Sequence, residues 1–217
     1  MNKLNGVLAL AAFLIVGSAH ATTIAIIDSG TDLTHKDLQS KAWVNPKDVD
    51  DAVDNDDNGY IDDVNGWNFA DGNNKLIDRK FLGTFSSDVY KFFEVQTRLL
   101  KGQGTEEDKA WMAAARENTA LIAELGTFGN FVHGTHVAGI SANDAAAARI
   151  MGLKIMATKV QAPPAMGGGS SGNGRGLHLS AKVIKGFLKL LAGQQSKALA
   201  PMSAYVKKEN ARVANCS

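Results

Sequence analysis

Apolar and polar positions form two kinds of pattern along the chain. Residues 22–27 (TTIAII) and 149–160 (RIMGLKIMATKV) are runs rich in apolar and β-branched side chains, which is typical of buried strands in a parallel sheet. Residues 88–101, 105–125 and 179–191 instead place apolar side chains at helical spacing. Strands that alternate with helices predict an α/β fold with a parallel central sheet.

Local signals predict where these helices begin and end. Thr105 and Asp108 come close to a capping box, so we expect the second helix to begin there. Gly126 is expected to end the second helix, and Gly193 the third. A further helix is expected to begin near His133 and to run through VAGISANDAAAA, and residues 212–217 (RVANCS) predict the start of another strand.

The first 21 residues predict a secretory signal peptide rather than part of the fold. Lys3 precedes an apolar run from Val7 to Val16, and Ala19-His20-Ala21 has the small-x-small pattern of a cleavage site before Thr22. The apolar run is short for a membrane span. We therefore expect a secreted or periplasmic protein with no membrane association after cleavage, and a mature domain over residues 22–217.

Composition narrows the class of protein. The chain has 217 residues and a formal net charge of +1, which argues against a nucleic-acid partner because such proteins carry a basic excess. A single cysteine excludes a disulfide framework within the chain. The balance hides an asymmetry, because residues 22–78 hold 13 acids and 4 bases, a net of −9. The remaining residues, 79–217, carry a net of +9.

Two long segments between the regular elements stand out by composition. Residues 45–74 are rich in Asp, Asn and Gly and are expected to be mostly loop, and residues 162–176 predict a Gly/Ser-rich loop. Residues 79–127 are expected to form a helical insertion. Neither loop carries an internal repeat.

Three segments contain residues suited to one site: IAIIDSGTDLTHKDL (24–38), FVHGTHVAGI (131–140) and ARIMGLKI (148–155). A catalytic histidine needs an acceptor on one ring nitrogen and a free second nitrogen that can take a proton. Asp28, at the carboxyl end of the first strand, can supply that acceptor to His133. Gly134 is expected to allow the backbone to pass close to the substrate.

Together these segments resemble the subtilisin-like serine proteases, the subtilases. The resemblance implies a three-layer α/β fold with a parallel central sheet that is incomplete at the C-terminus. It also implies endopeptidase activity on peptide or protein substrates, with Asp28 as the acid of the triad and His133 as its base. His136, the second His of the motif, is expected to be structural.

The serine nucleophile of that family is missing from this sequence. In the family it lies in G-T-S-M-A-x-P, and no serine after His133 has that surrounding. Residues 168–172 (GGSSG) match G-x-S-x-G but lie in a Gly/Ser run without the strand and helix that a nucleophile elbow requires. Val213–Ser217 resembles the strand that lines the family's substrate cleft. We therefore expect the N-terminal part of a catalytic domain, inactive alone, whose partner is a missing C-terminal half.

The acidic segment 50–63 (DDAVDNDDNGYIDD) has seven Asp in fourteen positions and predicts a calcium site. Its spacing reproduces the first half of an EF-hand loop, in which alternate residues of a tight turn aim oxygens inward. The twelfth position is Asn65 rather than Glu, so Asp62 or Asp63 would have to complete the shell. The expected calcium ligands are Asp54, Asp56, Asn58, Tyr60 and Asp62. The run NDDNGYIDDVNGWNFA also resembles a segment of some subtilases.

Two other functional classes stay open at this point. One is a non-catalytic remnant that binds peptide or calcium. The other is a metal-dependent hydrolase that uses His133 and His136, although the zinc-helix signature places its histidines four residues apart with an adjacent Glu.

Overall fold

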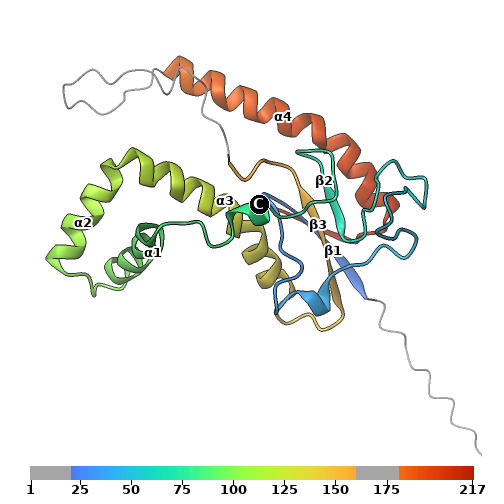
Figure 1. Cartoon of the computed structure of the whole chain (residues 1–217), viewed down its shortest axis with the longest axis horizontal. Coiled ribbons are helices and arrows are strands. Elements are labelled where there is room, and N and C mark those ends of the chain that lie inside the picture. Colours follow the sequence, from blue (N-terminus) through green and yellow to red (C-terminus); the bar gives the residue numbers. More distant parts are fainter. Residues whose placement is uncertain (1–20, 160–180) are drawn as a thin grey trace, which may run out of the picture.

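The computed structural model describes residues 21–159 and 181–217, and it shows an α/β arrangement around one parallel sheet (Figure 1). The strand order is β2-β3-β1-β4, and every pair is parallel. The strands are β1 (Thr22–Asp28), β2 (Gly66–Asn68), β3 (Ala148–Lys154) and β4 (Val213–Cys216). The predicted fold class and the first strand are therefore confirmed.

Side chains that alternate along β1 divide the core into two layers. Ala25 and Ile27 face α4 (Ala181–Lys208), where Met202 and Tyr205 close one apolar cluster. Ile26 faces α3 (Thr119–Ala142) and packs in a second cluster that contains Ala138 and Ala142. The sheet lies between these helices (Figure 1), which explains why the middle residues of its central strands β1 and β3 are apolar on both faces.

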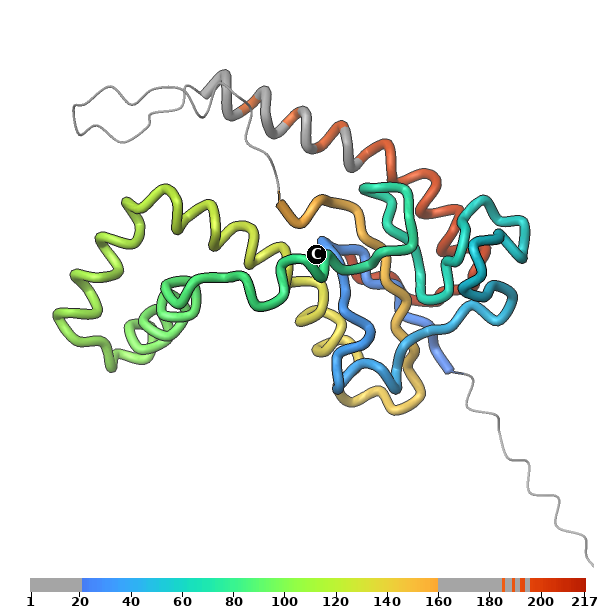
Figure 2. The backbone as a smooth tube through the Cα atoms, viewed as in Figure 1, coloured from blue at the N-terminus to red at the C-terminus, as the bar shows by residue number. Residues whose placement is uncertain are grey.

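The segment between β2 and α3 forms a helical arm that extends away from the sheet (Figure 2). It contains α1 (Ser87–Leu100) and α2 (Glu106–Glu117), which pack on the first turns of α3. A small core of Val89, Ala115 and Leu121 joins the three helices, and aromatic side chains surround it. Two short 3-10 turns, η1 (Gln39–Lys41) and η2 (Arg79–Phe81), complete the elements.

The expected helix over 105–125 is wrong in its second half. The capping box at Thr105 and Asp108 is present, but the helix ends at Glu117 because Asn118 leaves helical geometry. The side chain of Asn118 then accepts the backbone N–H of Leu121 and begins α3. Gly126 does not end a helix, since packing of α3 outweighs its weak helix propensity.

Two other expectations also need correction. The helix expected to begin near His133 starts fourteen residues earlier, at Thr119, and ends at Ala142. The helix expected to stop at Gly193 continues to Lys208, because Met202 and Tyr205 anchor its last turns in the core. Residues 45–74 are mostly loop, as expected, and they contain the short strand β2, in which Trp67 is buried in the core.

The remaining sequence predictions fall into two groups. The strand expected over 149–160 ends at Lys154, and the strand expected at 212–217 is observed as β4. The signal segment up to residue 20 and the Gly/Ser-rich loop at 162–176 lie outside the described residues. Within the described ranges, no helix is both long and apolar enough to span a bilayer.

Candidate active site

Asp28 is the last residue of β1, and its side chain lies on the face of the sheet that α3 covers. The alternation that places Ile26 against α3 also places Asp28 there, two residues further along the strand. The side chain of Asp28 is only 2% exposed. A carboxylate buried to this extent at the carboxyl end of a parallel strand requires a partner.

His133 supplies that partner from the middle of α3. Its Nδ1 lies 2.8 Å from Oδ1 and 2.9 Å from Oδ2 of Asp28. Because an ionised carboxylate can only accept, Nδ1 carries the proton and Nε2 is the unprotonated nitrogen of the neutral ring. The imidazole is 52% exposed, so Nε2 is accessible to a substrate or a nucleophile.

The turn after β1 holds the carboxylate in place. The backbone N–H and the hydroxyl of Ser29 both donate to Oδ1 of Asp28, at 2.7 and 2.9 Å. Gly30 follows with φ of 131°, a conformation that favours glycine. In the D-S-G sequence, Ser29 therefore holds Asp28 with its hydroxyl and amide groups, and Gly30 provides the backbone conformation of the turn.

Gly134 allows α3 to approach this turn closely. A Cβ atom at Gly134 would collide with the carbonyl oxygen of Gly30 and would lie 3.0 Å from the Cβ of Asp28. The glycine that follows His133 therefore sets the separation between the helix and the end of β1. The sequence predicted a close approach to the substrate at this position, whereas the segment that the structure places against Gly134 is the D-S-G turn.

Lys154 is a residue of this region that the sequence reasoning missed. It ends β3, pairs with Asp28 across the sheet and has no exposed surface. Its Nζ donates to the carbonyl of Ser29 at 2.7 Å and to Oγ1 of Thr158 at 3.0 Å. Burial lowers the pKa of the Lys154 ammonium, and the nearby carboxylate of Asp78 opposes that shift. The sequence feature that could have revealed Lys154 is a lysine at the end of the apolar run that forms β3.

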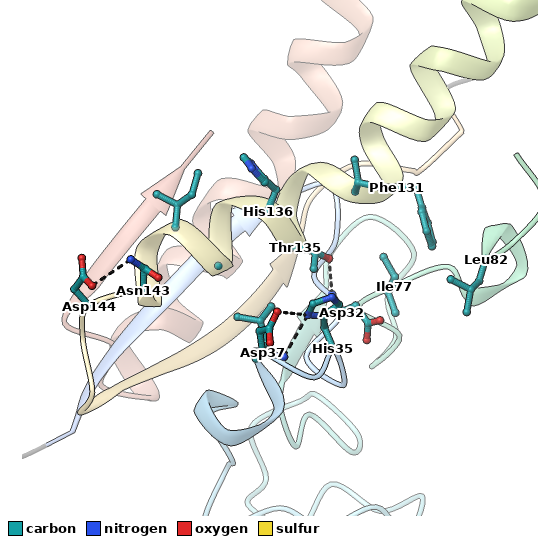
Figure 3. A pocket seen from close by; sticks show the side chains of 14 residues that line it. Asp32, His35, Asp37, Ile77, Leu82, Phe131, Thr135, His136, Asn143 and Asp144 are labelled. Atoms are coloured by element: carbon teal, nitrogen blue, oxygen red, sulfur yellow. Dashed lines mark hydrogen bonds and ion pairs between the residues drawn. The ribbon is translucent and has the colours of Figure 1, made fainter. Parts of the chain in front are cut away.

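His136 lies apart from the Asp28–His133 pair. It lines a cavity of about 730 Å³ between α3 and the loop that follows β1 (Figure 3), and neither Asp28 nor His133 lines that cavity. Thr135, which also lines it, accepts the backbone N–H of Asp32 at 2.9 Å. The two histidines of the motif therefore lie at different sites: His133 contacts Asp28, and His136 lines the cavity.

The end of β4 also lies beside the pair. Asn215 is registered with Ile26, and its amide nitrogen lies 3.4 Å from the hydroxyl of Ser141 on α3. Ser217 donates from its hydroxyl to the side-chain oxygen of Asn215 at 2.8 Å. Both polar residues therefore occupy the face of the sheet that carries Asp28.

In the acidic loop, residues 50–63, three of the expected ligands are joined by hydrogen bonds within one turn: Asp54, Asn58 and Tyr60. Asp54 accepts the backbone N–H groups of Asn58 and Gly59, and Asn58 accepts that of Tyr60. Burial raises the pKa of Asp54, but these hydrogen bonds outweigh it and leave the pKa below its usual value. Asp62 turns away and accepts the N–H groups of residues 51 and 52.

Asp63 takes the inward position beside Asp56. It is fully buried and accepts hydrogen bonds from the amides of Asn45 and Asn58, at 2.7 and 3.0 Å. Burial raises the pKa of Asp63. Sequence spacing left the choice between residues 62 and 63 open, and the fold resolves which of them faces inward.

Tyr205, in the last turn of α4, and Glu209, directly after that helix, add two polar groups to this loop. Burial raises the pKa values of Tyr205 and Glu209, and the carboxylates of Asp56 and Asp63 add to the effect. Three buried oxygens here have no hydrogen-bond partner among the residues that the structure describes: Oδ1 of Asp56, the hydroxyl of Tyr205 and Oε1 of Glu209. Oxygen donors of this kind suit a hard cation such as Ca²⁺. Glu209 lies far from the loop in sequence, so spacing could not reveal it.

The donor chemistry fits calcium, but the geometry fits only in part. Over residues 21–159 and 181–217, no three His, Cys, Asp or Glu side chains gather closely enough to hold a metal ion. Closing a shell around one ion would therefore require the loop to tighten and to use amide or carbonyl oxygens. The same finding offers no support for a metal centre at His133 and His136.

Comparison with known proteins finds related segments in subtilisin-like proteases, while no family model matches the chain. The chain is 40% identical over 70 residues to subtilisin-like protease 1 of Plasmodium vivax, covering 31% of this chain and 11% of that protein. It is 35% identical over 71 residues to the Plasmodium falciparum protein, covering 32% and 10%. For the Plasmodium berghei protein the identity is 37% over 78 residues, covering 35% and 13%.

The chain thus spans about a tenth of the length of the curated relatives it matches. About a third of its own length is related in sequence to subtilisin-like proteases, and its α/β arrangement is consistent with a subtilisin-like fold.

Proposed function

We propose that the chain carries the acid–base part of a subtilisin-like serine endopeptidase site. The observation that supports this proposal is the buried carboxylate of Asp28 within 2.9 Å of Nδ1 of a half-exposed His133. The pair lies at the carboxyl edge of a parallel sheet, where α/β proteins place their sites. The segments related to subtilisin-like proteases support the same class of reaction.

In this proposal each residue has a distinct role. Nε2 of His133 would take the proton of a serine hydroxyl as its oxygen attacks a peptide carbonyl, and would then return the proton to the leaving amine. Asp28 would hold the ring in the correct tautomer and stabilise the imidazolium. Ser29 and Gly134 would fix the carboxylate and the distance to the helix.

The nucleophile would have to come from another polypeptide segment, because the G-T-S-M-A motif is absent from this sequence. We therefore propose a C-terminal half as the partner of this chain, and peptides or proteins as the substrate of the complete site. The same proposal makes the chain alone inactive as a peptidase.

The test joins this chain to the reading frame that follows its last codon and measures cleavage of a chromogenic peptide. If that frame encodes Gly-Thr-Ser-Met-Ala, we expect the joined protein to cleave the peptide. Asp28→Asn should lower kcat about 10⁴-fold, because the imidazole loses its correct tautomer, and His133→Ala should abolish turnover. Chain 1–217 alone should match its His133→Ala variant.

Two results would contradict the proposal. Turnover by chain 1–217 that depends on His133 would show that the missing serine motif is not needed. Equal activity of the joined protein and its Asp28→Asn variant would show that the pair is not part of the reaction.

Two alternative functions make different predictions. A non-catalytic remnant would bind peptides without cleaving them in the joined protein as well as alone. A metal-dependent hydrolase would lose activity to a chelator but not to a serine-reactive fluorophosphonate. The bond from Nδ1 of His133 to Asp28, and the separate surroundings of His136, favour the serine-protease proposal.

We also propose that the acidic loop binds Ca²⁺ and that the protein is exported. The unpartnered oxygens of Asp56, Tyr205 and Glu209 support the first proposal, since a cation would neutralise buried acids and fill their coordination. For the second, the predicted cleavage site coincides with the first residue of β1, Thr22, so cleavage would leave the strand intact.

A further inference from the structure

A lysine with no exposed surface ends β3, directly beside the candidate catalytic pair. A buried ammonium is costly unless hydrogen bonds and an opposite charge compensate it. Lys154 has both, because it donates to the carbonyl of Ser29 and the hydroxyl of Thr158, and its Nζ lies 3.8 Å from Oδ2 of Asp78. Neither the proposed chemistry nor the apolar core requires a charge at this position.

The hydrogen bonds of Lys154 converge on the turn that holds Asp28. Its shortest hydrogen bond, at 2.7 Å, is to the carbonyl of Ser29. Ser29 in turn donates from its amide and its hydroxyl to Oδ1 of Asp28. Asp28 in turn holds Nδ1 of His133. Hydrogen bonds on either side of Ser29, joined through the covalent structure of that residue, therefore connect the ammonium of Lys154 to the imidazole.

The same turn is held on its other side by the loop before η2. The backbone N–H of Thr31 donates to the carbonyl of Leu76 at 3.0 Å, and a Cβ at Gly30 would lie 3.6 Å from Nζ of Lys154. Asp78, two residues after Leu76, faces the ammonium. Lys154 therefore connects the D-S-G turn to this loop as well as to β3.

We infer that Lys154 is a positioning residue, which fixes the Ser29 carbonyl so that the Asp28 carboxylate stays aligned with Nδ1 of His133. This role rests on the proposed function, because a positioning residue requires a catalytic pair to position. It extends that function to a residue on a third strand. A lysine that only stabilised the fold would leave the geometry of the pair unchanged in any variant that still folds.

The test measures the Nδ1–H proton of His133 by NMR in chain 1–217. A hydrogen bond to a carboxylate moves this proton far downfield and slows its exchange with water. Lys154→Met keeps most of the apolar stem but removes the ammonium. We expect the signal to move upfield and the proton to exchange about tenfold faster, which corresponds to about 1.4 kcal/mol of lost hydrogen-bond energy.

A matched control and a second variant make the result interpretable. Lys159→Met removes an exposed lysine close in sequence and should leave the signal unchanged. If Lys154→Met alone does not fold, Lys154→Met combined with Asp78→Asn also removes the uncompensated carboxylate and should give the same upfield shift. Circular dichroism establishes that each variant is folded.

The outcomes separate this inference from the proposed function. A downfield signal that Asp28→Asn abolishes but folded Lys154 variants retain would overturn the role of Lys154 and leave the pair intact. Absence of the signal in the unmodified chain, or its persistence in Asp28→Asn, would overturn the pair and the proposed function with it. An upfield shift in Lys154→Met but not in Lys159→Met supports the inference.

Discussion

At the scale of single residues, the candidate site depends on groups that carry no charge as much as on its acid and base. Ser29 supplies two donors to Asp28, and Gly134 supplies only the absence of a side chain. Such residues are informative because their substitution changes geometry without removing a titrating group. Gly134 offers the sharper experiment, since α3 contains other glycines for comparison.

Gly134→Ala should destabilise the protein by about 1–3 kcal/mol, the usual cost of an overpacked contact. The added methyl group would meet the backbone of Gly30, which cannot rotate away as a side chain could. Urea denaturation measures the change. Gly129→Ala is the matched control, because a Cβ there meets nothing within 4 Å and should stabilise the helix by about 0.5–1 kcal/mol. Equal effects at the two positions would refute the close approach.

At the scale of elements, the helical arm depends on a few polar contacts between its helices. Asp108 completes the capping box of α2 and also receives two hydrogen bonds from the guanidinium of Arg98 on α1, at 2.6 and 3.0 Å. The bonds from Arg98 lower the pKa of Asp108 to about 2. One carboxylate therefore caps a helix and joins it to its neighbour.

The stability of the arm should decrease in acid for this reason. A carboxyl whose folded pKa lies below its unfolded value of about 3.9 stabilises the fold fully above that value. That contribution is then lost as the pH falls from about 4 towards 2. The Asp108→Asn variant lacks this stabilisation at every pH. The difference in melting temperature between the unmodified protein and this variant should therefore shrink as the pH falls from about 4 towards 2. A difference that stays constant from pH 5 to pH 2 would show that Asp108 is not the titrating group.

At the scale of the whole molecule, the acidic segment in the first third of the sequence contacts a segment close to the C-terminus. The acidic loop packs against the end of α4 and the residue that follows it, where Tyr205 and Glu209 lie near Asp56 and Asp63. These acids repel one another, and the charge of Lys47 offsets the repulsion at Glu209 only in part, because the pKa of Glu209 stays raised. Any ion that binds there would therefore strengthen the attachment of α4 to the sheet.

Calcium at about 100 times its Kd should stabilise the protein by about 2.7 kcal/mol and raise Tm by about 5–10 °C. Differential scanning calorimetry in EDTA and in millimolar Ca²⁺ measures the shift. A variant that combines Asp54→Asn with Asp56→Asn should lose most of it, while Asp88→Asn on the exposed surface of α1 should keep it. The same Tm with and without calcium would exclude the site.

Export is tested on the same scale, by N-terminal sequencing of the protein secreted or released from the periplasm. We expect a mature protein that begins at Thr22, since the residues before it have the pattern of a cleaved signal peptide. An intact N-terminus on protein that stays inside the cell would contradict this prediction.

The sequence by itself determined the elements whose signals are local. The apolar run before Asp28 is a strand, the Thr105–Asp108 box begins a helix, and residues 213–216 form a strand. The D-S-G and H-G-T-H motifs pointed to Asp28 and His133, which the structure brings within hydrogen-bond distance. These features depend on short-range periodicity, capping and backbone conformation, which one segment of sequence contains in full.

Only the tertiary structure decided what depends on distant partners. Helix α3 continues through Gly126 and α4 through Gly193, because packing outweighs the local cost of glycine. The direction of Asp63, and the contact of Glu209 with the acidic loop, follow from the docking of α4. Lys154 gains its place beside Asp28 only when β3 pairs with β1, because the energy of a buried charge is set by the groups that the fold places around it.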